Sequence, residues 1–340
     1  MSSAKIGAVT HLPADGAELA RRVRIMDKAG FDSLWMYETC FAAESVCRAG
    51  FIAACTEKAS IACGVLNPYT RHPGLIALAA ATLDRIANGR LILVMGAGGK
   101  EWMEGILRYT RRKPATNLSD AVEVVRRMLA GDKVTLDGPG FSIRNAVLDG
   151  PPLRPRIPIY LAAEREEMLK TVAKVADGIW LFQMPSIGYV RWACDFIGKV
   201  QANPSAIEVG TVFPLRITDD SAKEYEELKQ WMAFYLSIPA IGEQYLRRGG
   251  YDETILRPIR EAMKTDKLAN PHDAFKVGNI AEAVKHIPTE LIKDSSIIGT
   301  AAECREKLGE LERAGLTFVA LSFQNKFDQT IANVHEILPN

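Results

Sequence analysis

The sequence has no long apolar run and almost no net charge. Its longest apolar stretch, Gly74–Leu83, is far shorter than the about 18 residues that a membrane-spanning helix needs. The N-terminus also lacks the charged and apolar regions of a secretory signal peptide, so we expect a cytoplasmic protein without a membrane anchor. The 42 basic and 41 acidic side chains leave a net charge of +1. This balance offers no electrostatic surface for nucleic acid.

The sequence is also poor in the motifs of metal sites and covalent catalysis. Its five histidines form neither an HxxxH nor an HExxH pattern, and its six cysteines include no CxxC pair. A Gly-x-Ser-x-Gly motif is absent as well. We therefore expect no metal site and no nucleophilic serine or cysteine. The cysteines are interpreted as small core residues in a reducing compartment.

What the sequence does contain is a repeated unit of helix, glycine and apolar strand. An apolar pattern of helical period leads in each case to Gly30, Gly178 or Gly315, and a short apolar run follows. Glycine at such a place is expected to adopt the left-handed conformation that ends a helix. Apolar strands reached through helices indicate a parallel sheet covered on both faces. The three segments are Leu19–Tyr37, Met168–Phe182 and Glu303–Phe323.

Short apolar runs give eight strand candidates, and helical segments separate most of them. Eight alternating units predict a single (β/α)8 TIM-type barrel over residues 1–340, with about 90 residues beyond the about 250 of an ordinary barrel. The excess is expected in insertions at about residues 100–156, with a hairpin turning at Asp137–Gly140, and 237–298. The candidates are Lys5–Val9, Ser33–Tyr37, Ser60–Val65, Leu91–Met95, Ile157–Leu161, Gly178–Phe182, Glu208–Leu215 and Thr317–Ser322.

In such a barrel the functional residues lie at the carboxyl ends of the strands. The richest of these ends is Met95–Trp102, where glycines and a lysine stand between a strand and a helical segment. Backbone N–H groups in that context bind phosphate, although a tight turn without a ligand explains the pattern too. The strand ends are His11, Glu38–Thr39, Gly64–Asn67, Gly96–Lys100, Ala162–Glu164, Gln183–Met184 and Gln324–Asn325.

The stretch Ser60–Lys100 resembles the luciferase-like flavin- and deazaflavin-dependent oxidoreductases. It contains a GxxNPYTRHP motif at Gly64–Pro73, a TLDxxxxGR motif at Thr82–Arg90 and a glycine-rich loop at Gly96–Lys100. Within that superfamily these motifs are most like those of the methylene-tetrahydromethanopterin reductases. GFDSLWM and VADGIWL resemble two further blocks, and the likeness extends over essentially the whole chain.

The resemblance implies hydride transfer between the deazaflavin coenzyme F420 and a small substrate, such as a pterin, in a homodimer or higher oligomer. It implies a non-proline cis peptide at Gly64–Val65, behind the coenzyme ring. The coenzyme-binding residues that it implies are Gly64, Val65, Asn67, Gly96, Ala97, Gly98, Gly99, Lys100, Ala162 and Ala163. From the chemistry of a carboxyl at a strand end, Glu38 is the candidate proton donor or charge stabiliser, and Thr39 and His11 are candidate substrate or ring contacts.

Several positions depart from the family pattern. Glu38–Thr39 replaces the Asp-His pair of many members, and acidic residues follow Ala163 where the family usually has a glycine. Glu38 is either a proton donor or a carboxylate that caps the following helix. Three other readings therefore stay open: an FMN-dependent monooxygenase, a reductase that uses NAD(P)H directly, and a barrel that binds a ligand without hydride transfer.

Overall fold

The computed structural model describes residues 4–11, 15–38, 43–181, 183–201, 207–238, 241–268 and 273–338. The strands are β1 Lys5–Val9, β2 Ser33–Trp35, β3 Ser60–Leu66, β4 Leu91–Met95, β5 Val134–Asp137, β6 Ser142–Ala146, β7 Ile159–Ala162, β8 Gly178–Trp180, β9 Glu208–Ile217, β10 Ile297–Gly299 and β11 Phe318–Ser322. The helices are α1 Gly16–Ala29, α2 Ser45–Cys55, α3 Pro73–Ile86, α4 Pro114–Leu129, α5 Glu166–Val172, α6 Ile187–Val200, α7 Ser221–Ser237, α8 Gly242–Gly249, α9 Leu256–Met263, α10 Ala274–Val277, α11 Ile280–Ala283, α12 Thr289–Asp294, α13 Ala301–Arg313 and α14 Phe327–Ile331.

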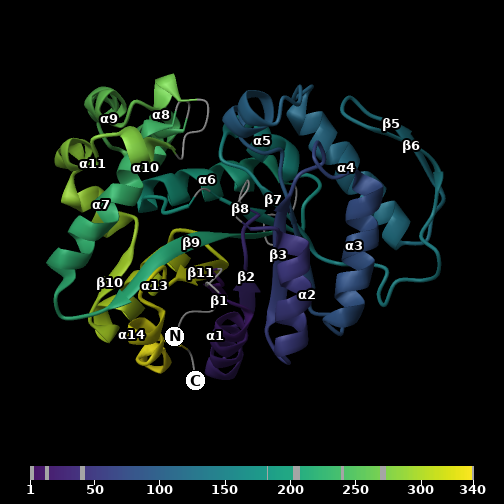
Figure 1. The fold of residues 1–340 in the computed structure, drawn as a ribbon, viewed down its shortest axis with the longest axis horizontal. Helices are drawn as coiled ribbons and strands as arrows, with labels where there is room; N and C mark the ends of the chain where they lie inside the picture. Colours follow the sequence, from purple (N-terminus) through teal and green to yellow (C-terminus); the bar gives the residue numbers. More distant parts are fainter. Residues whose placement is uncertain are drawn as a thin grey trace.

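Eight of the described strands close a parallel barrel (Figure 1). The hydrogen-bonded order is β1, β2, β3, β4, β7, β8, β9 and β11, and β11 pairs again with β1. This confirms the predicted (β/α)8 fold, and all eight predicted strands are present. The short strand β10, which sequence reasoning did not find, adds to β9 beyond the barrel.

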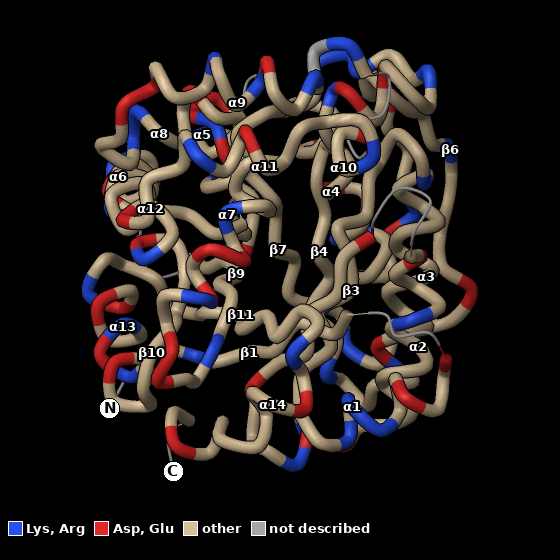
Figure 2. The backbone as a smooth tube through the Cα atoms, turned by 60° about the vertical axis from the view of Figure 1, so that its left-hand side comes forward, with Lys and Arg blue, Asp and Glu red and all other residues tan. Residues whose placement is uncertain are grey.

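Two places between barrel strands hold extra elements. Between β4 and β7 the chain forms α4 and the antiparallel hairpin β5–β6, as predicted. Between β9 and β11 it forms the helices α7 to α13. In Figure 1 the hairpin lies beside α3 and α4, and the helices α7 to α11 gather on the opposite side. Figure 2 shows that most charged residues lie on helices and loops around the central strands.

Large aromatic rings fill the inside of the barrel. The Trp35 ring stacks on Phe318, with ring centroids 5.0 Å apart, and lies 4.2 Å from the Trp180 ring. Glycines on neighbouring strands make room for these rings, because a Cβ atom on Gly178 would come within 2.8 Å of the Tyr160 ring. The prediction that Gly178 ends a helix in the left-handed conformation was wrong, since it is the first residue of β8. Only Gly30 and Gly315 of the three have positive φ.

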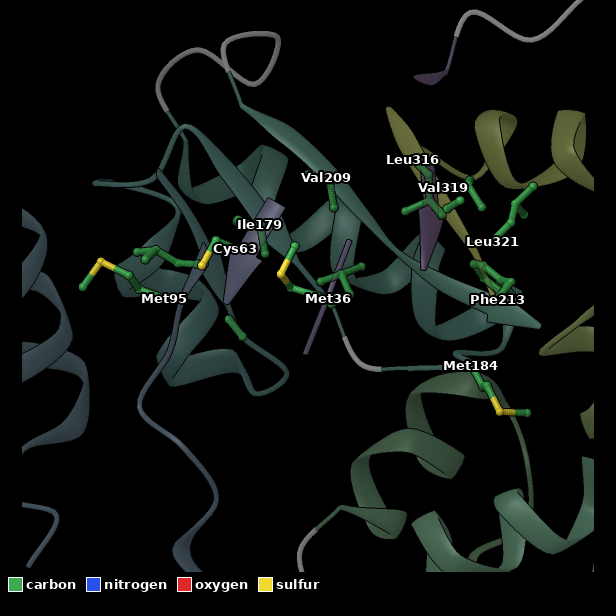
Figure 3. Close-up of a cluster of buried hydrophobic side chains, with 14 of the residues drawn as sticks. Met36, Cys63, Met95, Ile179, Met184, Val209, Phe213, Leu316, Val319 and Leu321 are labelled. Carbon is green, nitrogen blue, oxygen red and sulfur yellow. The ribbon is translucent and has the colours of Figure 1, made fainter. Parts of the chain in front are cut away.

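The opposite faces of the strands pack against the helices. Met36, Cys63 and Ile179 belong to this outer layer (Figure 3), whereas Trp35 and Ala62 belong to the inner one. Side chains therefore alternate strictly between the two layers, as the pleat of a strand requires. The expectation that cysteines are core residues holds for Cys63 but not for Cys47, which is exposed. Cys40 lies outside the described residues.

No helix in the described part of the chain has the length and apolar character needed to cross a membrane.

Candidate active site at the carboxyl ends of the strands

The end of β3 contains a cis peptide bond between Gly64 and Val65, as the family resemblance implied. The pairing of β3 with β4 shifts register between Cys63 and Leu66, and Val65 packs with the inner layer while staying partly exposed. A Cβ atom on Gly64 would lie 2.2 Å from the carbonyl oxygen of Val94. Glycine is therefore required where β3 and β4 approach most closely.

The glycine-rich loop after β4 faces this bulge. A Cβ atom on Gly96 would lie 2.6 Å from Val65 Cγ1 and 3.2 Å from Ala162 Cβ. Val65, Gly96 and Ala162 thus form a surface of small residues across the ends of β3, β4 and β7. Ala163 lies in the outer layer instead and does not face this surface, although sequence reasoning grouped it with Ala162.

The rest of the loop carries donors that a ligand could use. Gly98 has φ +67°, and a Cβ atom there would lie 2.3 Å from Asn67 Nδ2. The buried Asn67 amide donates to Met103 Sδ at 3.3 Å, and thioether sulfur is a weak acceptor. Gly99 and Lys100 are exposed, whereas Ala97 is buried. Lys100 has no ion-pair or hydrogen-bond partner among the described residues.

A single π-helical turn, Glu101–Ile106, follows the loop. Such turns are rare and occur often at functional sites. This turn brings Met103 against the Asn67 amide.

Glu164 is the first of the acidic residues that follow Ala163, in the loop where the resembled family usually has a glycine. Burial raises the pKa of its carboxyl to about 7, Arg165 opposes the rise and Glu101 adds to it. The backbone carbonyl oxygen of Glu164 accepts a hydrogen bond from the Tyr189 hydroxyl at 2.6 Å. Glu166, the next acidic residue of this loop, pairs with Arg248 at 3.2 Å. The negative charge expected here from the sequence is thus partly removed by protonation and pairing.

His11 lies at the end of β1, with its Nε2 atom 2.9 Å from Ser322 Oγ. Burial, together with the nearby charges of Arg48, Arg216 and Arg22, lowers the pKa of the imidazole to about 4. His11 is consequently neutral at physiological pH and can serve as a hydrogen-bonding group.

Glu38, the predicted proton donor, does not follow the inward direction of β2. Its Oε2 atom accepts a hydrogen bond from Ser45 Oγ at 2.6 Å, at the first residue of α2. This contact is what the alternative reading of Glu38, as a carboxylate at a helix terminus, leads one to expect. Its backbone N–H donates to the Gly64 carbonyl oxygen at 2.8 Å, which ties β2 to the bulge of β3. Thr39 lies outside the described residues.

Sequence reasoning missed Tyr37, which precedes Glu38. The ring of Tyr37 packs with the inner layer and meets Trp180 edge to face at 5.9 Å. The signal was present in the alternation Ser33, Trp35, Tyr37, which puts these residues on one face of the strand.

A buried charged cluster also went unnoticed. Arg216, near the end of β9, pairs with Glu224 at 3.2 Å and donates to Gln324 Oε1 at 2.7 Å. Lys326 completes the cluster at 2.6 Å from Glu224. Arg216 contributes to the low pKa of His11, which links the cluster to the strand ends. The sequence carries little signal for it, because Arg216 and Glu224 lie more than 100 residues from Gln324 and Lys326.

Together these features define a barrel whose carboxyl ends offer small residues on one side and neutral polar groups on the other. Among the described residues, no group of three or more His, Cys, Asp or Glu side chains is arranged to hold a metal ion. The side chains present can orient a ligand and hold protons. A bound organic cofactor normally supplies redox chemistry in such a site.

Comparison with known proteins supplies the family. Residues 1–317 match the model of a family described as luciferase-like monooxygenase, so the chain belongs to that family.

Individual relatives are more distant. The 5,10-methylenetetrahydromethanopterin reductase of Archaeoglobus fulgidus is 28% identical over 303 residues, which cover 89% of this chain and 88% of that protein. The F420-dependent glucose-6-phosphate dehydrogenase of Beutenbergia cavernae is 32% identical over 171 residues, 45% of this chain and 49% of that protein. The structure of the coenzyme F420 dependent tetrahydromethanopterin reductase from Methanopyrus kandleri superimposes with a TM-score of 0.82 at 24% identity, over 99% of both chains. This last likeness concerns the fold.

Proposed function

We propose that the protein is an oxidoreductase that transfers a hydride between coenzyme F420 and a small substrate. The observation that carries this proposal is the surface formed by Val65, Gly96 and Ala162 beside the cis peptide at Gly64. Side chains this small leave room for a flat ring against the strand ends. The similarity to the F420-dependent glucose-6-phosphate dehydrogenase of Beutenbergia cavernae supports the choice of coenzyme.

The residues present fit such a coenzyme. Lys100 and the exposed backbone of Gly98 and Gly99 would hold its phosphate, and the Asn67 amide would face its ring. When bound, coenzyme F420 supplies the carbon that accepts or donates the hydride. His11 is proposed as a neutral contact to substrate or ring. Glu38 would act through Ser45 on the start of α2, and Thr39 stays a proposed substrate contact.

The direct test is a titration of the purified protein with oxidised coenzyme F420, FMN and NADPH, followed by tryptophan fluorescence. We expect micromolar binding of coenzyme F420 and at least tenfold weaker binding of the other two. Gly98→Ala should weaken coenzyme binding at least tenfold, because the new Cβ atom would meet Asn67 Nδ2 at 2.3 Å. Gly198→Ala is the matched control, since no atom lies within 4 Å of its Cβ position. Preferential binding of FMN would instead support a monooxygenase, and binding of none would support a barrel without hydride transfer.

We further propose that the chain forms a single luciferase-like domain. Two copies of this domain would associate through α2 and α3. Phe51 on α2 and Leu75, Leu78 and Ile86 on α3 are exposed apolar side chains on adjacent helices. A patch of this kind marks an interface, and a two-fold axis would pair it with itself. Light scattering should show a dimer that Leu78→Glu dissociates; a monomeric wild-type protein would refute the interface. A pterin substrate and a cytoplasmic location stay predictions.

A further inference from the structure

The hydroxyl group of Tyr37 is buried and has no hydrogen-bond partner in the described part of the chain. Buried tyrosine hydroxyls in this protein otherwise find partners: Tyr189 donates to the Glu164 carbonyl oxygen at 2.6 Å, and Tyr245 lies 2.7 Å from Ser295 Oγ. A buried donor without a partner destabilises the folded protein, because it gives up its hydrogen bonds to water and gains none in return. The Tyr37 hydroxyl is therefore an exception that needs a reason.

The surroundings of Tyr37 place this hydroxyl at the mouth of the barrel. Its ring lies on the inner layer, edge to face with Trp180, in the same cluster as Val65 and Ala162. The ring is thus on the same side of the sheet as the proposed coenzyme surface, two residues beyond the aromatic layer of Trp35.

Tyr37 is also held firmly. The buried Arg48 side chain of α2 donates to the carbonyl oxygens of Tyr37, at 3.3 Å, and of Thr10. The guanidinium group thereby joins the ends of β1 and β2. Tyr235 of α7, which adds to the raised pKa of Tyr37, donates to Gln183 Oε1 at 2.6 Å.

The Tyr37 hydroxyl keeps its proton at physiological pH and can therefore donate a hydrogen bond. Burial raises the pKa of Tyr37 well above its ordinary value, and Tyr235 raises it further. A neutral, buried phenol suits an uncharged acceptor. A carbonyl oxygen is an acceptor of this kind, whereas a carboxylate carries a charge.

We propose that Tyr37 is a specificity-determining residue whose hydroxyl donates a hydrogen bond to a carbonyl oxygen of the substrate, an assignment that rests on the proposed oxidoreductase function. The substrate then lies between the coenzyme surface at Val65 and the Tyr37 hydroxyl. Because the acceptor comes from the ligand, the donor stays unpaired until the substrate binds. Substrates without an oxygen at that place leave the donor buried and unsatisfied, and the site rejects them.

The first experiment separates a binding role from a structural one. Tyr37→Phe removes an unpaired donor, so the melting temperature of the unliganded protein should stay the same or rise. Tyr245→Phe is the matched control, since it removes a hydroxyl that is paired with Ser295 and should lower the melting temperature by about 1–4 °C. An equal fall in both variants would show that the Tyr37 hydroxyl stabilises the fold, and would overturn the proposal.

The second experiment measures recognition with two ligands of the same shape, cyclohexanone and methylenecyclohexane, in the presence and absence of coenzyme F420. Wild-type protein should bind the ketone at least tenfold more tightly, and Tyr37→Phe should reduce this preference to threefold or less. Coenzyme affinity should be the same in both proteins. No preference in the wild-type protein, or an undiminished preference in Tyr37→Phe, would overturn the proposal. Failure of the proposed function would look different: wild-type protein would not bind coenzyme F420, whatever its preference between the two ligands.

Discussion

Glu164 offers a quantitative test of the electrostatics at the strand ends. Replacing it by glutamine keeps the shape of the side chain and removes the charge. Burial raises the pKa of this carboxyl from an ordinary 4.5 to about 7 in the folded protein. Between about pH 4.5 and pH 7 the Glu164 carboxyl therefore keeps its proton in the folded protein, whereas the unfolded chain releases it. Stability must fall as pH rises through this window, and the full penalty is present above pH 7.

The size of the penalty follows from the pKa. One pH unit of difference corresponds to about 1.4 kcal/mol, so ionising Glu164 in the folded protein costs about 3 kcal/mol. Solvent screening at the mouth of the barrel reduces this to about 2–3 kcal/mol. Glu164→Gln should accordingly be more stable than the wild type by that amount at pH 8, and nearly equal to it at pH 4.5.

Urea unfolding followed by tryptophan fluorescence at pH 4.5, 6 and 8 measures the difference. Comparing the two proteins cancels the contributions of the other titrating groups. One of these groups is His11, whose low pKa makes stability fall as pH drops from 6.5 towards 4. Glu167→Gln is the control, because it removes an exposed carboxylate at a neighbouring position. A stability difference that stays constant between pH 4.5 and pH 8 would refute the reasoning.

Three further variants probe the site. Gly64→Ala should destabilise the protein by about 3 kcal/mol or more and lower its melting temperature, because the Cβ atom would lie 2.2 Å from the Val94 carbonyl oxygen; an unchanged melting temperature would contradict the tight approach of β3 and β4. Lys100→Gln should weaken coenzyme F420 binding about tenfold in a titration without changing stability, and an unchanged Kd would remove Lys100 from the phosphate site. Arg216→Met should cost about 3 kcal/mol in urea unfolding, since Glu224 loses one of its buried partners; a loss below about 1 kcal/mol would show the pair to be unimportant.

The barrel itself was predictable from the sequence, because strand periodicity and glycine placement are local signals. The eight strands and the β5–β6 hairpin were found, and the family resemblance anticipated the cis peptide at Gly64–Val65. The role of Gly178 was not predictable, because it depends on the Tyr160 ring of a neighbouring strand. Short segments such as β10 lack the length for a periodic pattern.

Which side chains at the strand ends point into the barrel was harder to predict than the fold, for a geometric reason. Choosing the residues that follow a strand does not say which of them points into the barrel, and a change of one residue reverses the face. Glu38 was chosen for its chemistry, yet Tyr37 has the inward direction. The cluster of Arg216, Glu224 and Lys326 depends on contacts between distant segments and leaves no local pattern.

A crystal structure of the protein with oxidised coenzyme F420 tests the central claim most directly. The ring should lie against the cis peptide at Gly64–Val65, between Gly96 and Ala162, with the phosphate within reach of Lys100 and the Gly98–Gly99 backbone. The Tyr37 hydroxyl should make no hydrogen bond to the coenzyme. A ring bound elsewhere on the barrel, or a phosphate on the opposite side of the mouth from Lys100, would contradict the proposed function.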